Sequence, residues 1–337
     1  MREYMITPAE EGQTLLKYLE KALPFAGGGV IFKAMRKKNI VLNGGKTSGK
    51  EILKAGDSVR VFFSDEVIEK FSPKKKKAGN SVKTGSKEEK QFARSIVYED
   101  DNILIVNKWD NILSQSDGGA EASLNDLLLN YLKDTVKIYT IKPSVCNRLD
   151  RNTTGLVLCG KTQKGLRLLS DILKERSLGK YYYAVCCGVI EKGLSLKGYL
   201  YKDSKENRAL ITEEKVKDEA VQVLTDVEPV SMIKVKNVFL TLVKVHLITG
   251  KPHQIRAHMM YAGHPVMGDQ KYFTEESLKV SGDLKIKRQM LHAFRVEFPK
   301  IRGDLSYLSG KVFEAPVPDD MNRLLSHRTK GFTHYDS

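Results

Sequence analysis

The residues best suited to chemistry lie in one short segment, where an aspartate stands between two arginines. Asp150 lies between Arg148 and Arg151, a small polar turn and Gly155 follow, and the apolar run 156–158 comes next. Such a turn can hold an ionised carboxylate at the rim of a sheet, facing a polyanion. A lone aspartate is more often a turn or cap residue, so its interpretation depends on the neighbouring motifs.

Several further segments after this motif also contain residues that could take part in chemistry. They are Lys180-Tyr181-Tyr182-Tyr183-Ala184, the run TGKPHQIRAH at 249–258, Gly263-His264-Pro265 with Gly268-Asp269, Leu291-His292-Ala293, and Phe313-Glu314-Ala315-Pro316. Together with 147–158 these motifs resemble, in order and spacing over residues 97 to about 325, the RluA-type pseudouridine synthase family. Three positions depart from the family pattern: Asn147 replaces the usual His, Thr154 the usual Ser, and Trp109 the usual Pro.

The resemblance implies a pseudouridine synthase fold of the α+β class, with a largely antiparallel mixed sheet and a central cleft. It places Asp150 on the catalytic aspartate, Tyr182 on the active-site tyrosine, and Arg256 on the arginine that pairs with that aspartate. The reaction detaches uracil from its ribose and rejoins it through carbon 5. Nothing is oxidised or reduced, so no cofactor and no metal are expected. Whether Asp150 attacks the ribose or deprotonates it stays open.

The resemblance also suggests how the substrate is held. A uridine inside a stem must be flipped out of its stack before it can react, and we expect Arg148 to fill the gap or hold a phosphate. Ile255 and Leu291 are expected to wall the pocket. His253 and His258 are five residues apart, which on a helix separates them by about 140°, so a metal site is not favoured. His292 and Gln254 are expected to be structural hydrogen-bonding residues.

The charge of the chain favours a polyanionic partner. The formal net charge is +15, and residues 1–95 hold 20 Lys and Arg against 11 Asp and Glu. RNA fits this balance, although a merely solvated basic surface is the alternative. The four cysteines form no C-x-x-C pair, which favours free thiols in a reducing compartment. With no secretory signal and no long apolar run, we expect a cytoplasmic protein without membrane contact.

Residues 1–63 are expected to form a small separate domain. Helical spacing at 15–19 and 30–35 precedes short apolar runs at 40–42 and 58–63 that are typical of strands. This order resembles the S-four-type RNA-binding module, and the predicted RNA-binding residues at the end of its second helix are Lys33, Arg36, Lys37 and Lys38. Residues 64–94, which include four consecutive lysines at 74–77, predict a basic flexible linker.

Residues 95–337 are expected to form the catalytic domain. Strands are predicted at 103–106, 156–159, 181–186, 220–225 and 239–247. Helices are predicted at 123–133, with Ser123 as the N-terminal cap, and at 166–173. Alternation of Val243 and Val245 with Lys244 and His246 indicates a sheet with one wet face. Nothing in the sequence demands more than a monomer.

Three functions remain to be weighed. The leading one is a pseudouridine synthase acting on large-subunit ribosomal RNA, because an appended RNA module is commonest among such enzymes of the family. The alternatives are the same enzyme acting on transfer RNA, and a catalytically inactive RNA-binding protein. A metal-dependent nuclease would need clustered carboxylates and histidines, which the motifs do not offer.

Overall fold

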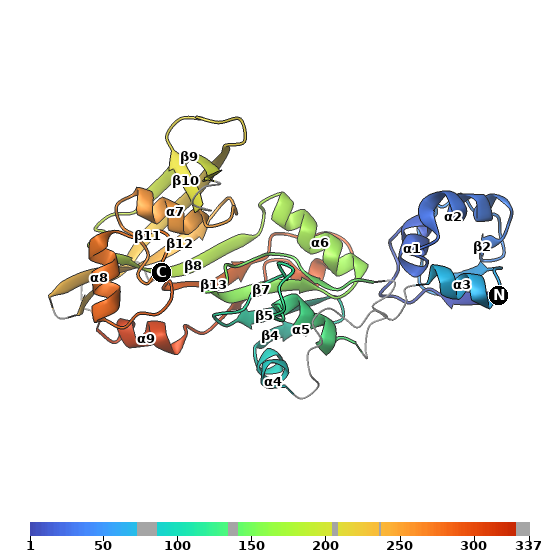
Figure 1. Ribbon diagram of the computed structural model, residues 1–337, viewed down its shortest axis with the longest axis horizontal. Helices are drawn as coiled ribbons and strands as arrows, with labels where there is room; N and C mark the ends of the chain where they lie inside the picture. Colours follow the sequence, from blue (N-terminus) through green and yellow to red (C-terminus); the bar gives the residue numbers. More distant parts are fainter. Residues whose placement is uncertain (73–85, 134–140, 204–207, 236, 328–337) are drawn as a thin grey trace. The chain divides into compact units, whose positions relative to one another are not determined.

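The computed structural model describes residues 1–72, 86–133, 141–203, 208–235 and 237–327 (Figure 1). The chain divides into two compact units. The first contains residues 1–106, 113–148 and 157–171, and the second contains residues 107–112, 149–156 and those from Ile172 onward. Strands β5 and β7 and helix α6 each contribute residues to both units.

The N-terminal part of the first unit contains a three-stranded sheet and two helices. Its elements are β1 (Arg2–Met5), α1 (Leu15–Ala22), α2 (Gly27–Arg36), β2 (Ile40–Leu42) and β3 (Ser58–Val61), with antiparallel strands in the order β1-β3-β2. The Thr14 side chain caps α1 by accepting a hydrogen bond from the Lys17 amide. The predicted helices and strands of this segment are confirmed, whereas its identity as an RNA-binding module stays a prediction.

The expected linker at 64–94 is helical at both ends, so that part of the prediction was wrong. Helix α3 (Asp65–Phe71) begins at Ser64 and α4 (Lys87–Arg94) begins at Ser86, and each serine side chain accepts an amide hydrogen bond. Each helix has acidic residues in its first turn and one buried apolar anchor, Ile68 or Phe92. These local signals outweigh the polar composition. The four lysines at 74–77 lie outside the described residues.

The rest of the first unit carries further strands and helices. Its elements are β4 (Ile96–Glu99), β5 (Ile103–Lys108), α5 (Leu124–Tyr131), β6 (Ser144–Val145), β7 (Thr154–Gly160) and α6 (Gln163–Lys174), with strand order β7-β5-β4 and β6 against β7. The predicted cap at Ser123 is confirmed, because Ser123 and Asp126 form a reciprocal capping box at the start of α5.

The second unit is built on a larger sheet. Its strands are β8 (Gly179–Cys187), β9 (Leu194–Asp203), β10 (Arg208–Thr212), β11 (Val221–Val235), β12 (Val238–Leu247), β13 (Leu291–Glu297) and β14 (Val312–Glu314). Their order is β10-β9-β11-β12-β8-β13, with β14 beside β13, and all these pairs are antiparallel. The start of β7 joins β13 in parallel. The predicted α+β class with a largely antiparallel sheet is confirmed.

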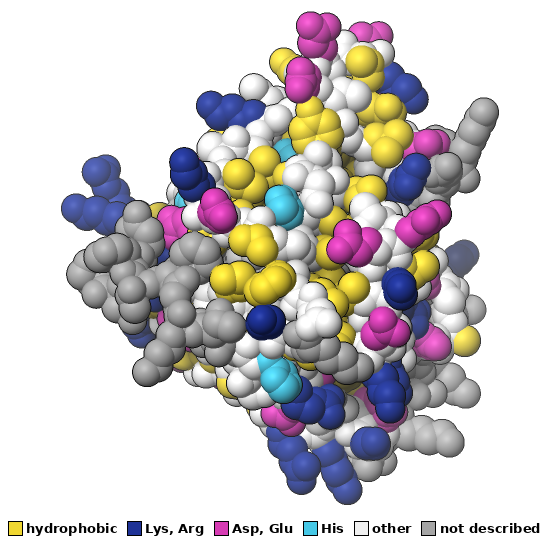
Figure 2. All heavy atoms as spheres, turned by 90° about the vertical axis from the view of Figure 1, so that its left-hand side faces the viewer, with side chains coloured by type: hydrophobic (Ala, Val, Ile, Leu, Met, Phe, Trp, Pro, Cys, Tyr) yellow, Lys and Arg dark blue, Asp and Glu magenta, His cyan; other side chains and the backbone are white. Residues whose placement is uncertain are grey.

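Three helices accompany this sheet: α7 (Gln254–Tyr261), α8 (Glu275–Asp283) and α9 (Asp319–Leu325). Val243 and Val245 in β12 are fully buried, while Lys244 and His246 are partly exposed, as the alternation predicted. Figure 2 shows that, where described side chains are visible on one face of the molecule, both charge signs are interspersed around hydrophobic groups. The excess positive charge is therefore not gathered on that face. No helix in the described part of the chain is long and apolar enough to cross a membrane.

Candidate active site

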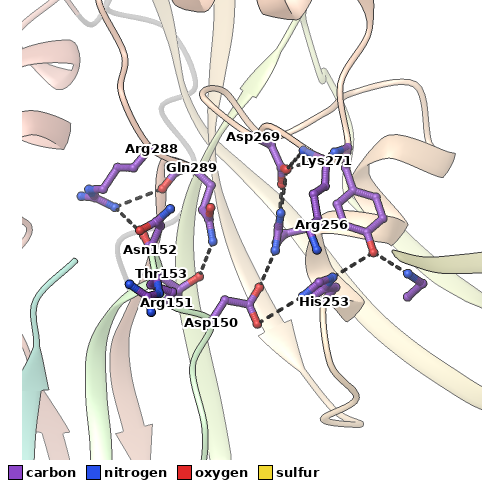
Figure 3. A network of polar contacts seen from close by, with 12 residues as sticks. Asp150, Arg151, Asn152, Thr153, His253, Arg256, Asp269, Lys271, Arg288 and Gln289 are labelled. Carbon is purple, nitrogen blue, oxygen red and sulfur yellow. Dashed lines mark hydrogen bonds and ion pairs between the residues drawn. The ribbon is translucent and has the colours of Figure 1, made fainter. Parts of the chain in front are cut away.

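The structure brings Asp150 and Arg256 into contact. Asp150 lies in the turn before β7, and Arg256 is the third residue of α7; Arg256 Nη1 donates to Asp150 Oδ2 at 2.7 Å (Figure 3). The Asp150 side chain is 25% exposed, whereas that of Arg256 is only 6% exposed. Among the described residues, no hydrogen-bond donor reaches Asp150 Oδ1. The Asp150 side chain is therefore partly exposed, and a buried cation fixes one of its two oxygens.

A second carboxylate holds the far side of the same guanidinium. Arg256 Nε and Nη2 donate to the two oxygens of Asp269 at 2.6 and 2.7 Å, and Asp269 also accepts the amides of Lys271 and Tyr272. Burial acts to lower the pKa of Arg256, but the hydrogen bonds and charge of Asp269, followed by those of Asp150, outweigh it and raise that pKa. Arg256 is therefore a fixed, permanently charged support for Asp150.

The turn that carries Asp269 requires a glycine before it. Gly268 has φ +76°, and a Cβ there would lie 2.0 Å from the Arg288 carbonyl oxygen. Gly268-Asp269 was part of the sequence motif, yet the sequence assigned Asp269 no role. The signal in the sequence was an acid directly after a glycine. The structure shows that this acid is buried and that the glycine is required.

His253 approaches the free oxygen of Asp150. It caps α7 in the left-handed conformation, and its Nε2 lies 3.9 Å from Asp150 Oδ1. Its Nδ1 lies 3.0 Å from the Tyr272 hydroxyl, whose oxygen accepts the Ala209 amide. Burial lowers the pKa of His253, so the ring is neutral near pH 7. If the Tyr272 hydroxyl donates to Nδ1, the ring proton sits on Nε2 and faces Asp150.

A buried lysine holds the turn that contains Asp150. Lys108 is fully buried at the end of β5, and its Nζ donates to the carbonyls of Trp109, Ile112 and Arg151 at 3.1, 3.0 and 2.9 Å. Burial lowers the pKa of Lys108 to about 7. Three carbonyl acceptors, however, match the three donors that only the ammonium form has, so we assign the charged form. Lys108 thus ties the 109–112 turn to the residue after Asp150.

Further contacts fix the residues after Asp150. Gln289 Nε2 donates to Thr153 Oγ1 at 3.0 Å, and Arg288, which is paired with Asp320, donates to the Asn152 carbonyl at 3.4 Å (Figure 3). The next side chain, Thr154 Oγ1, lies 2.8 Å from Nδ1 of the buried His292. His292 and Gln254 act as structural hydrogen-bonding residues, as expected; Gln254 joins Thr249 to Leu224 and Thr225.

Tyr182 lies on β8 with its side chain buried. Burial and then the charge of Asp150 raise its pKa, so its phenol is neutral in the free enzyme. Ile255 precedes Arg256 in α7, and Leu291 in β13 pairs with Ala184, two residues beyond Tyr182. Both are buried.

The other predicted binding residues are exposed. Arg148, two residues before Asp150, is exposed. The four basic residues at the end of α2 are exposed as well, namely Lys33, Arg36, Lys37 and Lys38. Within the described ranges, no group of three or more His, Cys, Asp or Glu side chains is arranged to hold a metal ion.

Comparison with known proteins identifies related sequences. Residues 102–261 match the family model described as RNA pseudouridylate synthase. The chain is 30% identical to ribosomal large subunit pseudouridine synthase C of Rickettsia felis over 82% of this chain and 85% of that protein. It is 29% identical to an uncharacterized RNA pseudouridine synthase of Mycoplasma capricolum over 93% of this chain and 96% of that one.

A solved structure shows the same fold. Human RNA pseudouridylate synthase domain containing 1 matches 70% of this chain and 87% of its own, with a TM-score of 0.54 and 23% identity. A relative of 30% identity that is matched over most of its length establishes the family, and the structural match supports the fold. This chain therefore belongs to the RNA pseudouridylate synthase family and is an isomerase of the pseudouridine synthase class.

Proposed function

We propose that this enzyme converts specific uridines of large-subunit ribosomal RNA to pseudouridine, and that Asp150 is its essential residue. The observation that carries the proposal is the partly exposed Asp150 carboxylate, one oxygen held by a buried arginine at 2.7 Å and the other 3.9 Å from the His253 ring. The target class is supported by the relatives named for the large ribosomal subunit in Pasteurella multocida and Rickettsia felis.

The reaction breaks one bond to ribose carbon 1 and forms another, and a single carboxylate can serve both steps. The bond from ribose carbon 1 to uracil nitrogen 1 breaks, the uracil turns, and carbon 5 bonds to ribose carbon 1 while its proton leaves. In one route Asp150 Oδ1 attacks carbon 1 as its bond to nitrogen 1 breaks, and carbon 5 later displaces the carboxylate. In the other route Oδ1 takes the proton from carbon 2 as the base leaves, and returns it when carbon 5 bonds to carbon 1. Arg256 orients this carboxylate, and Asp269 holds the guanidinium in place.

Tyr182 is assigned to the detached base. Its buried ring can stack on uracil and hold it while the bonds exchange. The raised pKa of its phenol favours this aromatic role over that of a base in the free enzyme. Ile255 and Leu291 add apolar walls, and Arg148 is assigned to the gap that the flipped nucleotide leaves.

The test of the essential residue is tritium release. Wild-type protein and the Asp150→Asn variant are incubated with 5-tritiated-uridine RNA, and release from carbon 5 is measured. We expect release by the wild type and a loss of at least 10⁴-fold, on the order expected for the sole reacting group, in the variant. The exposed Asp171 in α6, replaced by asparagine, removes the same charge as a control. Wild-type rates in Asp150→Asn would refute the assignment, and binding without any release by wild type would favour an inactive RNA-binding protein.

The N-terminal residues 1–63 are proposed to bind RNA through Lys33, Arg36, Lys37 and Lys38. The four charges are exposed where α2 ends, so phosphates can reach them. Deletion of 1–63 should weaken binding to a large ribosomal RNA transcript, while conversion of a short fragment is retained. Mapping pseudouridines in a deletion strain separates ribosomal from transfer RNA targets. Equal affinity of both proteins for the long transcript at moderate salt would contradict this role.

A further inference from the structure

The two oxygens of the Asp150 carboxylate face two different groups. Arg256 Nη1 donates to Oδ2 at 2.7 Å, while Nε2 of the His253 ring lies 3.9 Å from Oδ1 (Figure 3). Burial lowers the pKa of His253 by more than the charge of Asp150 raises it, so the ring is neutral near pH 7. A neutral imidazole carries one ring proton, and its effect on Oδ1 depends on which nitrogen holds that proton.

The hydroxyl of Tyr272 decides which nitrogen holds the proton. Tyr272 is buried, and burial raises the pKa of its phenol, so the hydroxyl stays protonated. Its oxygen accepts the Ala209 amide at 2.6 Å and lies 3.0 Å from His253 Nδ1. In the part of the chain that the structure describes, no other acceptor lies within hydrogen-bond distance of this hydroxyl. A buried donor without an acceptor is costly, so Tyr272 donates to Nδ1, and the ring proton is on Nε2, facing Asp150.

The groups that hold Arg256 also hold the two rings. The Tyr272 amide donates to Asp269 Oδ1 at 3.0 Å, and the guanidinium carbon of Arg256 lies 5.0 Å from the centre of the Tyr272 ring. The His253 ring packs edge-on against Tyr272, with the ring centres 5.7 Å apart and the planes at 89°. One connected set of contacts therefore presents a cation to one oxygen of Asp150 and a neutral donor to the other.

The local backbone does not explain a histidine at this position. His253 has φ +58°, in the left-handed region, and its side chain makes no capping hydrogen bond to α7. Glycine and asparagine adopt this conformation more easily. Because neither helix capping nor the turn requires an imidazole, the contacts of its two nitrogens with Tyr272 and Asp150 are the features that only histidine supplies.

We propose that His253 is a positioning residue, which orients the reacting oxygen of Asp150 through its Nε2–H while Tyr272 fixes the tautomer of the ring. This inference rests on the proposed function, in which Asp150 Oδ1 reacts with the ribose. The separation of 3.9 Å is longer than a hydrogen bond, and the contact shortens to one when the bound uridine closes the site. A neutral donor orients Oδ1, whereas a second cation would further lower the basicity of the carboxylate.

Two substitutions separate the roles of the two ring nitrogens. The side-chain amide of glutamine reaches about as far as Nε2 of histidine, and that of asparagine about as far as Nδ1. His253→Gln can therefore keep a donor near Asp150, whereas His253→Asn keeps only an acceptor for Tyr272. Single-turnover tritium release from a ribosomal RNA fragment gives the maximal rate and the half-saturating enzyme concentration of each protein.

The maximal rate should respond and the affinity should not. We expect His253→Asn to lower the maximal rate about tenfold, the effect of one neutral hydrogen bond, with little change in half-saturation. His253→Gln should recover most of that loss, because its amide can again donate to Oδ1. A wild-type rate in His253→Asn, or a loss that His253→Gln shares in full, would overturn the proposal.

Stability measurements separate positioning from a structural role. Asparagine suits the left-handed backbone at 253, which offsets part of the packing lost with the ring, so His253→Asn should stay folded at the assay temperature. Lys285 is exposed and also left-handed, with φ +55°, and provides the matched control. Lys285→Asn should convert uridine at the wild-type rate. A rate loss in His253→Asn that disappears when only folded protein is counted would show a purely structural role.

A measurement without turnover tests the tautomer. In protein with isotope-labelled histidine, the nitrogen resonances of the His253 ring are those that are missing from the spectrum of His253→Gln. We expect a protonated Nε2 and an unprotonated Nδ1 in the wild type near pH 7, and no such preference in Tyr272→Phe. The opposite tautomer or a charged ring in the wild type would refute the assignment.

The two proposals fail in different ways. If the wild type converts no uridine, the proposed function fails and the positioning role fails with it. If the wild type converts uridine, Asp150→Asn does not, and His253→Asn keeps the full rate, the positioning role fails alone.

Discussion

Replacing Asp269 by asparagine tests whether Arg256 must be held from behind to position Asp150. The side chain of Asp269 is fully buried and that of Arg256 is 6% exposed, and two hydrogen bonds of 2.6 and 2.7 Å join them. Removing one partner of a buried ion pair costs about 3–5 kcal/mol. Arg256 keeps Asp150 and the new amide oxygen can accept one bond, so we expect a loss near the lower limit, about 3 kcal/mol.

The effect on catalysis should exceed the effect on binding. Without Asp269 the guanidinium can move together with Asp150 and no longer fixes its position. A displacement of about 1 Å costs on the order of 10²-fold in rate. We expect the single-turnover rate at saturating enzyme to fall about that much, while affinity for RNA changes less than threefold. Urea unfolding measures stability, and tritium release measures the rate.

A matched ion pair provides the control. Asp320 holds Arg288 through bonds of 2.6 and 2.7 Å, but its side chain is 32% exposed. Asp320→Asn should therefore lose less stability and little rate. A full rate in Asp269→Asn despite lost stability would refute the positioning argument. An equal rate loss in both variants would show that any weakened ion pair in this unit impairs the enzyme.

The remaining predictions concern the turn, the sheet and acid stability. Lys108→Met should leave three carbonyls without their donor, lowering stability by about 2 kcal/mol and the rate at least tenfold; stability loss with an unchanged rate would contradict the anchor. Gly155 has φ +114°, and a Cβ there would lie 2.2 Å from a backbone oxygen of β13, so Gly155→Ala should lose more than about 3 kcal/mol. Gly282→Ala in α8, with open space around it, should be neutral or slightly stabilising, and similar losses in the two would reject the steric reason. Burial lowers the pKa of His258 and of His292 to about 4, so the unfolded chain binds more protons between pH 6.5 and 4, and each histidine should remove up to roughly 3 kcal/mol as the pH falls. Urea titrations of His258→Gln and His292→Gln should show a flatter pH dependence, and an unchanged slope would contradict it.

Local sequence patterns determined much of the fold. The alternation in β12 and the Ser123 cap each depend on residues within a few positions, and the structure has both where the pattern placed them. Helices α3 and α4 were missed, because a low apolar content hid one buried anchor in each, Ile68 and Phe92. The formation of these two helices depends on their serine caps and buried anchors, which the average composition does not reveal.

The sequence by itself identified a candidate acid, its partner and the class of reaction, because the motifs that contain Asp150, Tyr182 and Arg256 resemble those of a known family in order and spacing. Only the tertiary structure decided how the acid is held. Asp269, Lys108 and Gln289 come from three separate segments. Their partners Arg256, Arg151 and Thr153 lie 13, 43 and 136 positions away, and no local sequence pattern relates residues at such separations.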